Sequence, residues 1–545
     1  MRVAEAVGRA LAGAGVDHVF GVVGSGNFHV TNAMVDAGAT FVAARHEGGA
    51  ATMADAYART SGTVAALTVH QGCGLTNAMT GIAEAAKSRT ALVVLAPEAT
   101  TPTSNFYVDQ DALARAVGAV PLRVTDPATA VAAALSAVAI ARDQRRTVVL
   151  GLPLDVQDLD AGDPAFPPLP APSPPAGAAA ADNERLAEAI RAARRPVFVA
   201  GRGARAPEAG DALVALADQC GALLATSAVA KGLFTGEPWS LDVSGGFSSP
   251  LAAELIAGAD LVVGWGCALN MWTMRHGRLL AESATVVQVD DTPEALGAHR
   301  DLSFGVVGDV AATAAAVSAQ LAPGTGGAAV GYRSEELRAR LSTELRWRDV
   351  PFEDCSDETR IDPRALTIAL DDLLPRERVV SVDSGNFMGY PSMFLDVPDE
   401  QGFCFTQAFQ SIGLGLATAI GAGLARPDRL AVAALGDGGA LMGAAELDTV
   451  RRLGLAMVVV VYNDDAYGAE VHHFAGEQLA TVEFPPTDIA AVGRGYGFEA
   501  VTVRSLDDLG PVADWLAGPR VRPLLIDAKI VADEPSWWLA EAFGH

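Results

Sequence analysis

Basic residues are scarce in this chain of 545 residues, which contains 39 Lys and Arg against 65 Asp and Glu. The formal net charge is −26 at pH 7. Proteins that bind nucleic acid without sequence preference need Lys and Arg to neutralise phosphates, so this composition excludes that class of partner. An anionic ligand would have to be met locally, by backbone amides or by a metal ion.

Cysteine is also rare, and long apolar runs are missing. The five cysteines are scattered, odd in number and without the spacing of metal ligands. No segment of the sequence reaches the roughly 18 uncharged apolar residues of a membrane span. The first residues, MRVAEAVGRALAGAG, carry Glu5 and Arg9 inside an apolar stripe and predict an amphipathic helix rather than a signal peptide. We therefore expect a cytoplasmic protein with no membrane partner.

Short runs of Val, Ile and Leu are abundant, and longer amphipathic stretches separate them. Continuous runs of this kind are typical of strands buried on both faces, as in parallel α/β sheets. The predicted strands lie in HVFGVV, ATFVAA, VAALTV, ALVVLA and TVVLGL, then in RPVFVAGRGA, GALLATSAVAKG, ADLVVGWGCAL and ATVVQVDD, and finally in RVVSVDSGN, RLAVAALGDGG, AMVVVVYNDD and RPLLIDAKI.

The length predicts about three domains. A Pro- and Ala-rich stretch, DAGDPAFPPLPAPSPPAGAAAAD, predicts an irregular linker after the first group of strands, and the Gly-rich LAPGTGGAAVG closes the second group. We predict three successive parallel-sheet α/β domains at residues 1–160, 183–325 and 351–545, joined by linkers at 161–182 and 326–350.

Two polar clusters follow successive predicted strands of the third domain. LGDGG places Asp437 between two glycines, and YNDD places Asn463, Asp464 and Asp465 at the end of the next strand. The glycines would let the backbone approach a phosphate, but Asp437 would repel it, so the pattern implies an intervening cation such as Mg²⁺. Carboxyl ends of parallel strands meet at one edge of a sheet, so both clusters can hold one metal. For a lone Gly-Asp-Gly, a tight turn with solvated acids would be the favoured interpretation.

Gly-Asp-Gly followed by Asn-Asp one helix and strand later resembles the thiamine diphosphate signature. The three-domain order resembles the acetolactate synthase, benzoylformate decarboxylase and pyruvate decarboxylase superfamily over nearly the whole chain. The resemblance implies a pyrimidine-binding first domain, a middle domain and a diphosphate-binding third domain. It implies Mg²⁺ ligation by Asp437, Asp464 and the main-chain oxygen of Ala466. Asn is usual where Asp464 stands, and ligation by Asn463 instead would need a register shift of one residue.

The resemblance also implies a set of residues on the diphosphate side of the cofactor. The loop VVSVDSGNF resembles a second diphosphate-side loop, although it could be an ordinary strand-to-helix turn. The predicted cofactor-binding residues on this side are Asp383, Asn386, Gly436, Gly438, Gly439, Tyr467 and Gly468.

The first domain would supply the carboxyl group that activates the cofactor. Thiamine diphosphate works through a carbanion at its thiazolium C2, and its aminopyrimidine must act as the internal base. Glu47, between a predicted strand and a helix opened by glycines, matches the activating glutamate of the family, although it could simply complement a helix dipole. FQSIGLGLATAIGAGLA resembles the segment that supports the pyrimidine, with Ile412 as the bulky support and the Gln410 carbonyl as acceptor. Gly is more usual at position 410, and the segment could instead be a Gly-rich helix packed on a sheet.

Four more residues match positions near the substrate. His70 and Ser25 fall where benzoylformate decarboxylase-like enzymes carry an active-site histidine and serine, which suit proton relay and carboxylate binding. Glu470 matches, by its offset from Tyr467, a proton-transferring glutamate of pyruvate decarboxylase-like enzymes, and Gln110 resembles a cofactor-facing glutamine of the synthases. Their structural interpretations would be a satisfied imidazole, a turn serine, a solvated carboxylate and a polar residue at a helix start.

The resemblance implies a thiamine diphosphate- and Mg²⁺-dependent 2-oxo acid decarboxylase or carboligase, the latter with a second carbonyl compound as acceptor. A true acetohydroxyacid synthase with FAD is an alternative, but EVHHFAG lacks the Gln and Trp pattern of that enzyme and the middle domain shows no distinctive flavin signal. The chain could also be a catalytically silent cofactor-binding subunit, which the presence of Glu47 disfavours, or a sugar- or nucleotide-diphosphate binding protein. The family architecture implies a homodimer or homotetramer with the active site at the interface.

Overall fold

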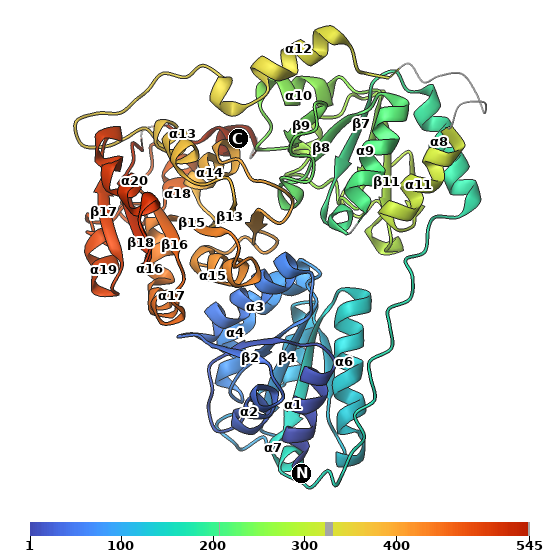
Figure 1. Cartoon of the computed structure of the whole chain (residues 1–545), viewed down its shortest axis with the longest axis vertical. Helices are drawn as coiled ribbons and strands as arrows, with labels where there is room; N and C mark the ends of the chain where they lie inside the picture. The colour runs from blue at the N-terminus through green and yellow to red at the C-terminus, as the bar shows by residue number, and fades with distance from the viewer. Residues whose placement is uncertain (207, 322–330, 533, 543–545) are drawn as a thin grey trace.

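Three parallel sheets of six strands organise the chain, one in each successive third. The computed structural model describes residues 1–206, 208–321, 331–532 and 534–542. Figure 1 shows the N-terminal domain at the bottom, the middle domain at the upper right and the C-terminal domain at the upper left. The predicted fold class, three successive parallel-sheet α/β domains, is confirmed.

The N-terminal sheet has the strand order β2-β1-β3-β4-β6-β5. Every residue of β4 and β6 is buried, as expected for central strands covered by helices on both faces. The strands are β1 His18–Gly21, β2 Thr40–Ala43, β3 Ala65–Thr68, β4 Leu92–Glu98, β5 Val120–Arg123 and β6 Thr147–Pro153. The helices are α1 Val3–Gly13, α2 Phe28–Asp36, α3 Glu47–Ser61, α4 Cys73–Lys87, α5 Gln110–Ala116, α6 Ala130–Gln144 and the short α7 Leu154–Gln157.

The middle sheet has the order β12-β11-β10-β7-β8-β9. Its strands are β7 Pro196–Ala200, β8 Leu223–Thr226, β9 Ser240–Val243, β10 Leu261–Trp265, β11 Thr285–Asp290 and β12 Phe304–Val307. Its helices are α8 Ala180–Ala192, α9 Ala209–Cys220, α10 Pro250–Ala257, α11 Val310–Leu321 and α12 Glu335–Glu344. Helix α8 begins inside the stretch predicted as the first linker, and α12 lies inside the second, where Leu337 and Leu341 pack into the core of the middle domain. The predicted domain limits themselves remain our proposal.

The C-terminal sheet has the order β14-β13-β15-β16-β18-β17. Its strands are β13 Arg378–Val382, β14 Phe403–Phe405, β15 Leu430–Gly436, β16 Met457–Asn463, β17 Glu499–Val503 and β18 Leu524–Lys529. Its helices are α13 Pro363–Leu373, α14 Gly389–Phe394, α15 Gly415–Ala425, α16 Asp437–Met442, α17 Leu447–Leu453, α18 Gly468–His473, α19 Ile489–Gly495, α20 Gly510–Ala517 and α21 Trp537–Ala542.

The N-terminal and C-terminal domains meet where α3 crosses α15. A Cβ atom at Gly421 would lie only 2.2 Å from the main-chain oxygen of Met53, so glycine is required for the two helices to approach this closely. Arg59, near the end of α3, forms buried ion pairs with Asp55 and Glu84. These ion pairs fix α3 against α4.

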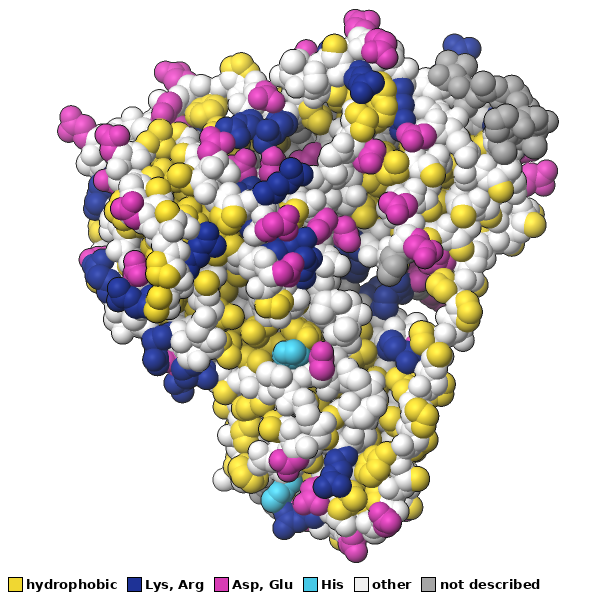
Figure 2. Space-filling model, in the orientation of Figure 1, with side chains coloured by type: hydrophobic (Ala, Val, Ile, Leu, Met, Phe, Trp, Pro, Cys, Tyr) yellow, Lys and Arg dark blue, Asp and Glu magenta, His cyan; other side chains and the backbone are white. Residues whose placement is uncertain are grey.

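The segment that leads into α15 is held by the same group of charges. Arg59 donates to the main-chain oxygen of Phe405 at 3.0 Å. The carboxylate of Glu84 accepts hydrogen bonds from the main-chain N–H groups of Ala408 and Phe409, at 3.1 and 2.6 Å. Hydrophobic side chains gather where these two domains meet (Figure 2).

The five cysteines are free in this structure. None of the helices in the described part of the chain is long and apolar enough to cross a membrane.

Candidate active site

The predicted site residues lie on loops at the carboxyl ends of two sheets. In the N-terminal sheet the strand order reverses between β1 and β3, and in the C-terminal sheet it reverses between β13 and β15. Such switch points leave a crevice at the carboxyl edge of an open α/β sheet, where ligands bind. Ser25 and His70 follow β1 and β3, while Asp383 and Asp437 follow β13 and β15.

Asp437 and Asp464 form the acidic centre of the C-terminal cluster. Asp437 is the first residue of α16 and is only 7% exposed, and Asp464 directly follows β16. Burial raises the pKa of both carboxyl groups, and the negative charge of Asp437 raises the pKa of Asp464 further. Two carboxyl groups that are close and shielded from water favour a cation between them. The structure therefore brings these two predicted metal ligands together.

The third predicted ligand is the main-chain oxygen of Ala466. The N–H of Ala466 donates to the carboxylate of Asp464, which turns the chain around this side chain. No hydrogen bond within the described residues is donated to the oxygen of Ala466, so that oxygen stays available. Those residues also contain no group of three or more His, Cys, Asp or Glu side chains suited to a metal, so a metal here would need further oxygen ligands.

The side chain of Asn463 is already engaged in hydrogen bonds with other residues. Its side chain is fully buried, donates to Asp527 at 2.9 Å and accepts from the main-chain N–H of Asp465 at 3.1 Å. Asp465 in turn pairs with Arg360 at 2.7 Å. Asn463 therefore shapes the loop, and this favours Asp464 rather than Asn463 as the ligand.

Glycines around this centre allow very close approaches. A Cβ atom at Gly439 would lie 2.3 Å from Oδ2 of Asp383, and one at Gly468 would lie 2.3 Å from Oδ2 of Asp464. Gly438 lies against the ring of Tyr467, which packs edge-on against Phe484 at 4.9 Å. The predicted set on these loops is thus assembled in one place, and Gly436 completes it beside Phe387.

Asp383 holds the loop before α15 through hydrogen bonds to its backbone. Its carboxylate is fully buried and accepts from the N–H of Ser384 at 2.8 Å and from the N–H of Gly413 at 3.0 and 3.1 Å. Burial raises the pKa of Asp383 to about 6 in spite of these donors. The side chain holds the loop that carries Ile412, so it positions the site, and its predicted contact with the cofactor remains a prediction.

The loop before α15 has a left-handed residue. Gln410 is exposed and has φ 59°, a conformation that costs a side chain about 1 kcal/mol or more and that glycine adopts freely. This geometry explains why glycine is more usual at position 410. Ile412, two residues on, is half-buried at the start of the Gly-rich segment.

In the N-terminal domain, Glu47 is the first residue of α3 and is 9% exposed. Its Oε2 accepts a hydrogen bond from Nδ2 of Asn77 at 3.1 Å. His46 caps the helix by accepting from the N–H of Gly48 at 3.0 Å. Because His46 already caps the helix, the Glu47 side chain is not needed for capping. The hydrogen bond from Asn77 holds the Glu47 carboxylate in a fixed position.

His70 lies beside Glu47, and Ser25 is on the loop that passes His70. Gly74 contacts both Glu47 and His70, because a Cβ atom there would lie 3.4 Å from Oε1 of Glu47 and 3.2 Å from Cβ of His70. The His70 ring packs edge-on against Phe106 at 5.4 Å, and its Nδ1 faces the N–H of Gly26 at 3.5 Å. Ser25 is exposed on the same loop as Gly26. The structure thus brings these three predicted residues into one cluster.

Gln110 and Glu470 are less clearly placed. Gln110 is only 2% exposed and donates to the main-chain oxygen of Pro97 at 2.7 Å. Glu470 is half-exposed on α18, with its Oε2 at 3.7 Å from Nδ1 of His473. The two remain predicted site residues that no observation tests.

Three residues at these clusters were missed by the sequence analysis. Asn77 holds Glu47, Phe106 covers His70, and Glu446 accepts hydrogen bonds from the main-chain N–H groups of Arg45 and His46. Asn77 has a local signal, because it stands in the helix that directly follows the glycine turn after His70. Glu446 has no such signal, because its partners lie 400 residues earlier in the chain.

The two clusters are separate within one chain. No hydrogen bond or ion pair among the described residues joins Glu47, His70 or Ser25 to Asp437 or Asp464. A cavity of about 430 Å³ lies instead between the middle and C-terminal domains, and none of the predicted site residues lines it. The predicted site residues are therefore taken from the chemistry of the two clusters and not from this cavity.

At the switch point of the middle sheet, the loops after β7 and β10 touch. A Cβ atom at Gly203 would lie 2.8 Å from Cα of Gly266. The hypothesis of a flavin in this domain gains no support from this arrangement.

Comparison with known families gives three matches along the chain. Residues 1–117 match "Thiamine pyrophosphate enzyme, N-terminal TPP binding domain", residues 183–317 match the central domain of the same enzymes, and residues 383–528 match their C-terminal TPP binding domain.

Curated proteins are similar over nearly the full length. The chain is 31% identical to the "probable 2-ketoarginine decarboxylase" of Pseudomonas aeruginosa over 527 residues, covering 93% of this chain and 90% of the relative. It is 28% identical to the sulfoacetaldehyde acetyltransferase of Castellaniella defragrans over 539 residues, covering 94% and 90%. It is 24% identical to the "probable acetolactate synthase large subunit" of Methanocaldococcus jannaschii over 530 residues, covering 93% and 88%.

Proposed function

Because the chain belongs to the thiamine pyrophosphate enzyme family, we propose that it is a thiamine diphosphate- and Mg²⁺-dependent enzyme acting on a 2-oxo acid. In this proposal the enzyme releases CO₂ from the acid. The carbon that carried the carboxylate then takes up a proton or forms a bond to a second carbonyl compound. The observation that carries the proposal is the pairing of two buried carboxyl groups, Asp437 and Asp464, at the carboxyl ends of neighbouring strands.

The C-terminal cluster fits Mg²⁺ and a diphosphate. Two carboxylates and the oxygen of Ala466 are hard oxygen donors, and Mg²⁺ completes its octahedron with phosphate oxygens and water. Without a cation, a diphosphate would face two like charges, which explains why metal and diphosphate would bind together. Gly438 and Gly439 let Tyr467 and Asp383 pack directly against the turn that follows Asp437.

The N-terminal cluster fits the catalytic half. Thiamine diphosphate, when bound, would supply a carbon nucleophile for a carbonyl carbon and a cationic ring that takes up the electron pair left by departing CO₂. Glu47 would hold a proton at its carboxylate against the pyrimidine ring, and Asn77 fixes the orientation of that carboxylate. The silent-subunit hypothesis predicts no such arrangement, because a non-catalytic subunit has no need of an oriented carboxyl group beside a histidine.

His70 and Ser25 are our proposed substrate residues. The Ser25 hydroxyl is exposed and can donate to a substrate carboxylate, and the His70 imidazole can move a proton near neutral pH. Glu470, on the loop after the metal ligands, is proposed as a second proton donor. Gln110 is buried against Pro97 and would act through the fold rather than by contact.

We further propose that two copies of the chain form each active site. Glu47 lies at the start of α3, whereas the loop leading to Ile412 is anchored by Arg59 and Glu84 near the other end, about 18 Å along the helix. Large apolar side chains are exposed around both clusters, as expected where a partner covers them. These are Val23, Phe28, Phe106 and Tyr107 near the first cluster and Phe409, Leu441, Met442, Phe474 and Phe484 near the second.

The relatives' names leave the acyl acceptor open, since they include a decarboxylase, an acetyltransferase and a synthase. A cytoplasmic location remains a prediction. The first experiment measures CO₂ release and product mass from pyruvate and bulkier 2-oxo acids, with thiamine diphosphate and Mg²⁺, with and without an aldehyde. Aldehyde product alone indicates a decarboxylase, and an acyloin or acetohydroxy acid indicates a carboligase. Absence of CO₂ from every acid tested contradicts the proposal.

A further inference from the structure

The C-terminal segment is bound to one of the predicted diphosphate-side residues. Ser536 donates its main-chain N–H to Oδ1 of Asn386 at 2.9 Å and its hydroxyl to the main-chain oxygen of Asn386 at 2.8 Å. The indole Nε1 of Trp538 donates to the same main-chain oxygen at 2.8 Å. All three hydrogen bonds are buried and join residues about 150 positions apart.

These bonds fix which way the amide of Asn386 points. A main-chain N–H can only donate, so the amide atom facing Ser536 must be the oxygen Oδ1. The amino group Nδ2 therefore points to the other side, and within the described residues it donates no hydrogen bond. Asn386 is 5% exposed, so most of its side chain is held between its neighbours.

Asn386 borders the acidic centre. A Cβ atom at Gly468 would lie 3.5 Å from Cβ of Asn386 and 2.3 Å from Oδ2 of Asp464. The Asn386 side chain is thus a neighbour of the predicted metal loop. An oriented amide donor in this place suits an anionic oxygen next to the metal.

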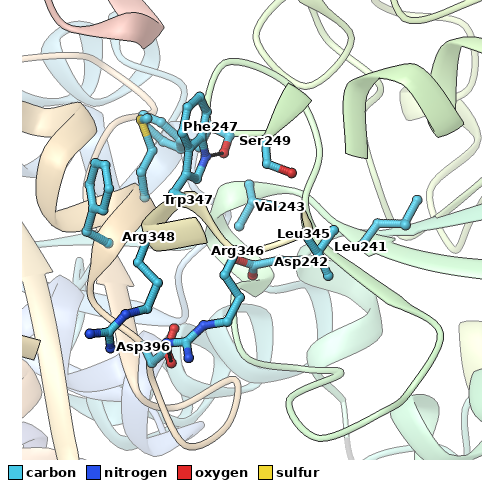
Figure 3. A pocket seen from close by; sticks show the side chains of 12 residues that line it. Leu241, Asp242, Val243, Phe247, Ser249, Leu345, Arg346, Trp347, Arg348 and Asp396 are labelled. Carbon is cyan, nitrogen blue, oxygen red and sulfur yellow. Dashed lines mark hydrogen bonds and ion pairs between the residues drawn. The ribbon is translucent and has the colours of Figure 1, made fainter. Parts of the chain in front are cut away.

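The segment itself is braced by the middle domain. Trp538 packs against Phe247 at 6.3 Å and fills the space left by Gly389, where a Cβ atom would lie 2.3 Å from its ring. Trp537 packs edge-on against Trp347 at 5.4 Å. Trp347 and Phe247 lie together on the wall of a small pocket of about 40 Å³ (Figure 3), and Nε1 of Trp347 donates to the main-chain oxygen of Phe247 at 2.7 Å.

We propose that Ser536 and Trp538 are positioning residues that orient Asn386, so that its Nδ2 donates to a diphosphate oxygen of the cofactor. This inference rests on the proposed function. It gives the middle domain a part in cofactor binding through Phe247, which packs against Trp538 and forms with Trp347 the aromatic wall on which the C-terminal segment rests. Each contact acts on Asn386 rather than on the substrate.

The test is the equilibrium affinity for thiamine diphosphate at saturating Mg²⁺, measured by calorimetry on the full chain. Ser536→Pro removes both donors of Ser536, and Trp538→Phe removes the indole donor while keeping an aromatic ring. Each should weaken binding about three- to tenfold, the effect of losing a hydrogen bond that orients a ligand group. Ser536→Ala, which keeps the N–H to Oδ1, should have the smallest effect of the three.

Trp537→Phe is the matched control, because the Nε1 of Trp537 is buried without a hydrogen-bond partner among the described residues. This variant should bind the cofactor like the unmodified protein. Unchanged affinity in Trp538→Phe, or an equal loss in Trp537→Phe, overturns the inference. If Ser536→Pro fails to fold, Trp538→Phe still decides. Lack of saturable binding by the unmodified protein would instead overturn the proposed function.

Discussion

Glu446 of the C-terminal domain accepts a 3.0 Å hydrogen bond from the main-chain N–H of His46, the residue before Glu47. The same carboxylate accepts from the N–H of Arg45 at 3.0 and 3.2 Å and from the hydroxyl of Thr449 at 2.6 Å. Glu446 lies in the turn that follows α16, the helix that begins at Asp437. One carboxylate thus ties the turn after α16 to the segment that presents Glu47, the proposed activating glutamate.

Glu446→Gln should lower both stability and turnover. The amide has an NH₂ group in place of one carboxylate oxygen, so one of the main-chain N–H groups or the Thr449 hydroxyl loses its acceptor. A hydrogen bond to a charged carboxylate is worth about 1–3 kcal/mol. Because the bonds hold the backbone beside Glu47, we expect kcat to fall about tenfold or more. The measurements are denaturant unfolding and steady-state kinetics. Asp448→Asn is the control, since Asp448 binds the Arg45 side chain and not the backbone, and its turnover should stay near normal. Equal effects on turnover in both variants would contradict the role of Glu446.

Glu47→Gln should separate catalysis from cofactor binding. The amide keeps the size of the side chain and its contact with Asn77, but it cannot hold a mobile proton. Turnover should fall by about 10²- to 10⁴-fold, while the dissociation constant for thiamine diphosphate stays within about threefold. Asn77→Ala should give a smaller loss, because the carboxylate is then present but less well oriented. Full turnover in Glu47→Gln would remove Glu47 from the mechanism.

Asp464→Asn tests the acidic pair through its pH dependence. The pKa is raised from its usual value near 4 to about 6 for Asp437 and to about 8 for Asp464. A carboxyl group with a raised pKa binds its proton more tightly in the folded state, so the stability it provides at acid pH is lost as the pH rises through that window. The metal-free variant lacks one of the two charges and should melt about 2 °C or more above the unmodified protein at pH 8, with little difference at pH 5.

Scanning calorimetry of the metal-free proteins from pH 5 to pH 9 measures this difference. Addition of Mg²⁺ and thiamine diphosphate should stabilise the unmodified protein more than the variant, because the cation relieves a repulsion that the variant no longer has. A variant that loses stability with pH as steeply as the unmodified protein would show that the two carboxyl groups do not interact.

His70→Ala distinguishes a catalytic from a structural imidazole. The ring is half-buried against Phe106, and within the described residues its hydrogen bonding is limited to a long bond from the N–H of Gly26. Removal of the ring should therefore leave the fold and the cofactor affinity nearly unchanged. We expect kcat/KM for the 2-oxo acid to fall about 10²-fold. Phe106→Leu, which keeps the imidazole, should lose much less. A His70→Ala protein that no longer folds would identify a structural histidine.

The strands that the sequence analysis missed are β5, β9, β12, β14 and β17, and all lie at the edges of their sheets. Central strands such as β4 and β16 are buried on both faces and therefore read as continuous apolar runs. Edge strands such as β5 and β17 are mostly half-exposed, so their sequences mix polar and apolar residues. Strand β14 is buried but only three residues long, which is too short for a recognisable pattern.

The same distinction explains which site residues could be predicted. Asp437, Asp464 and Glu47 stand in local motifs, where a strand end and a glycine turn appear together in the sequence. Glu446 and Ser536 act through contacts with backbone or side chains far away along the chain. A single sequence contains no sign of such pairings, because they depend on how the domains pack.

The final prediction concerns how many chains build one active site. Glu47→Gln and Asp437→Ala should each be inactive alone, and a mixture refolded together should regain about a quarter of the normal activity if two chains share each site. Random pairing gives half of the dimers one lesion from each variant, and in these dimers one site combines the intact Glu47 of one chain with the intact Asp437 of the other. If both groups came from the same chain, every site would keep one lesion and the mixture would stay inactive. The control pairs the double variant with the unmodified chain. If two chains share each site, a mixed dimer of this pair has no intact site. If each chain builds its own site, the mixed dimer keeps one intact site. Activity of isolated, doubly tagged dimers in the two pairings decides between these architectures.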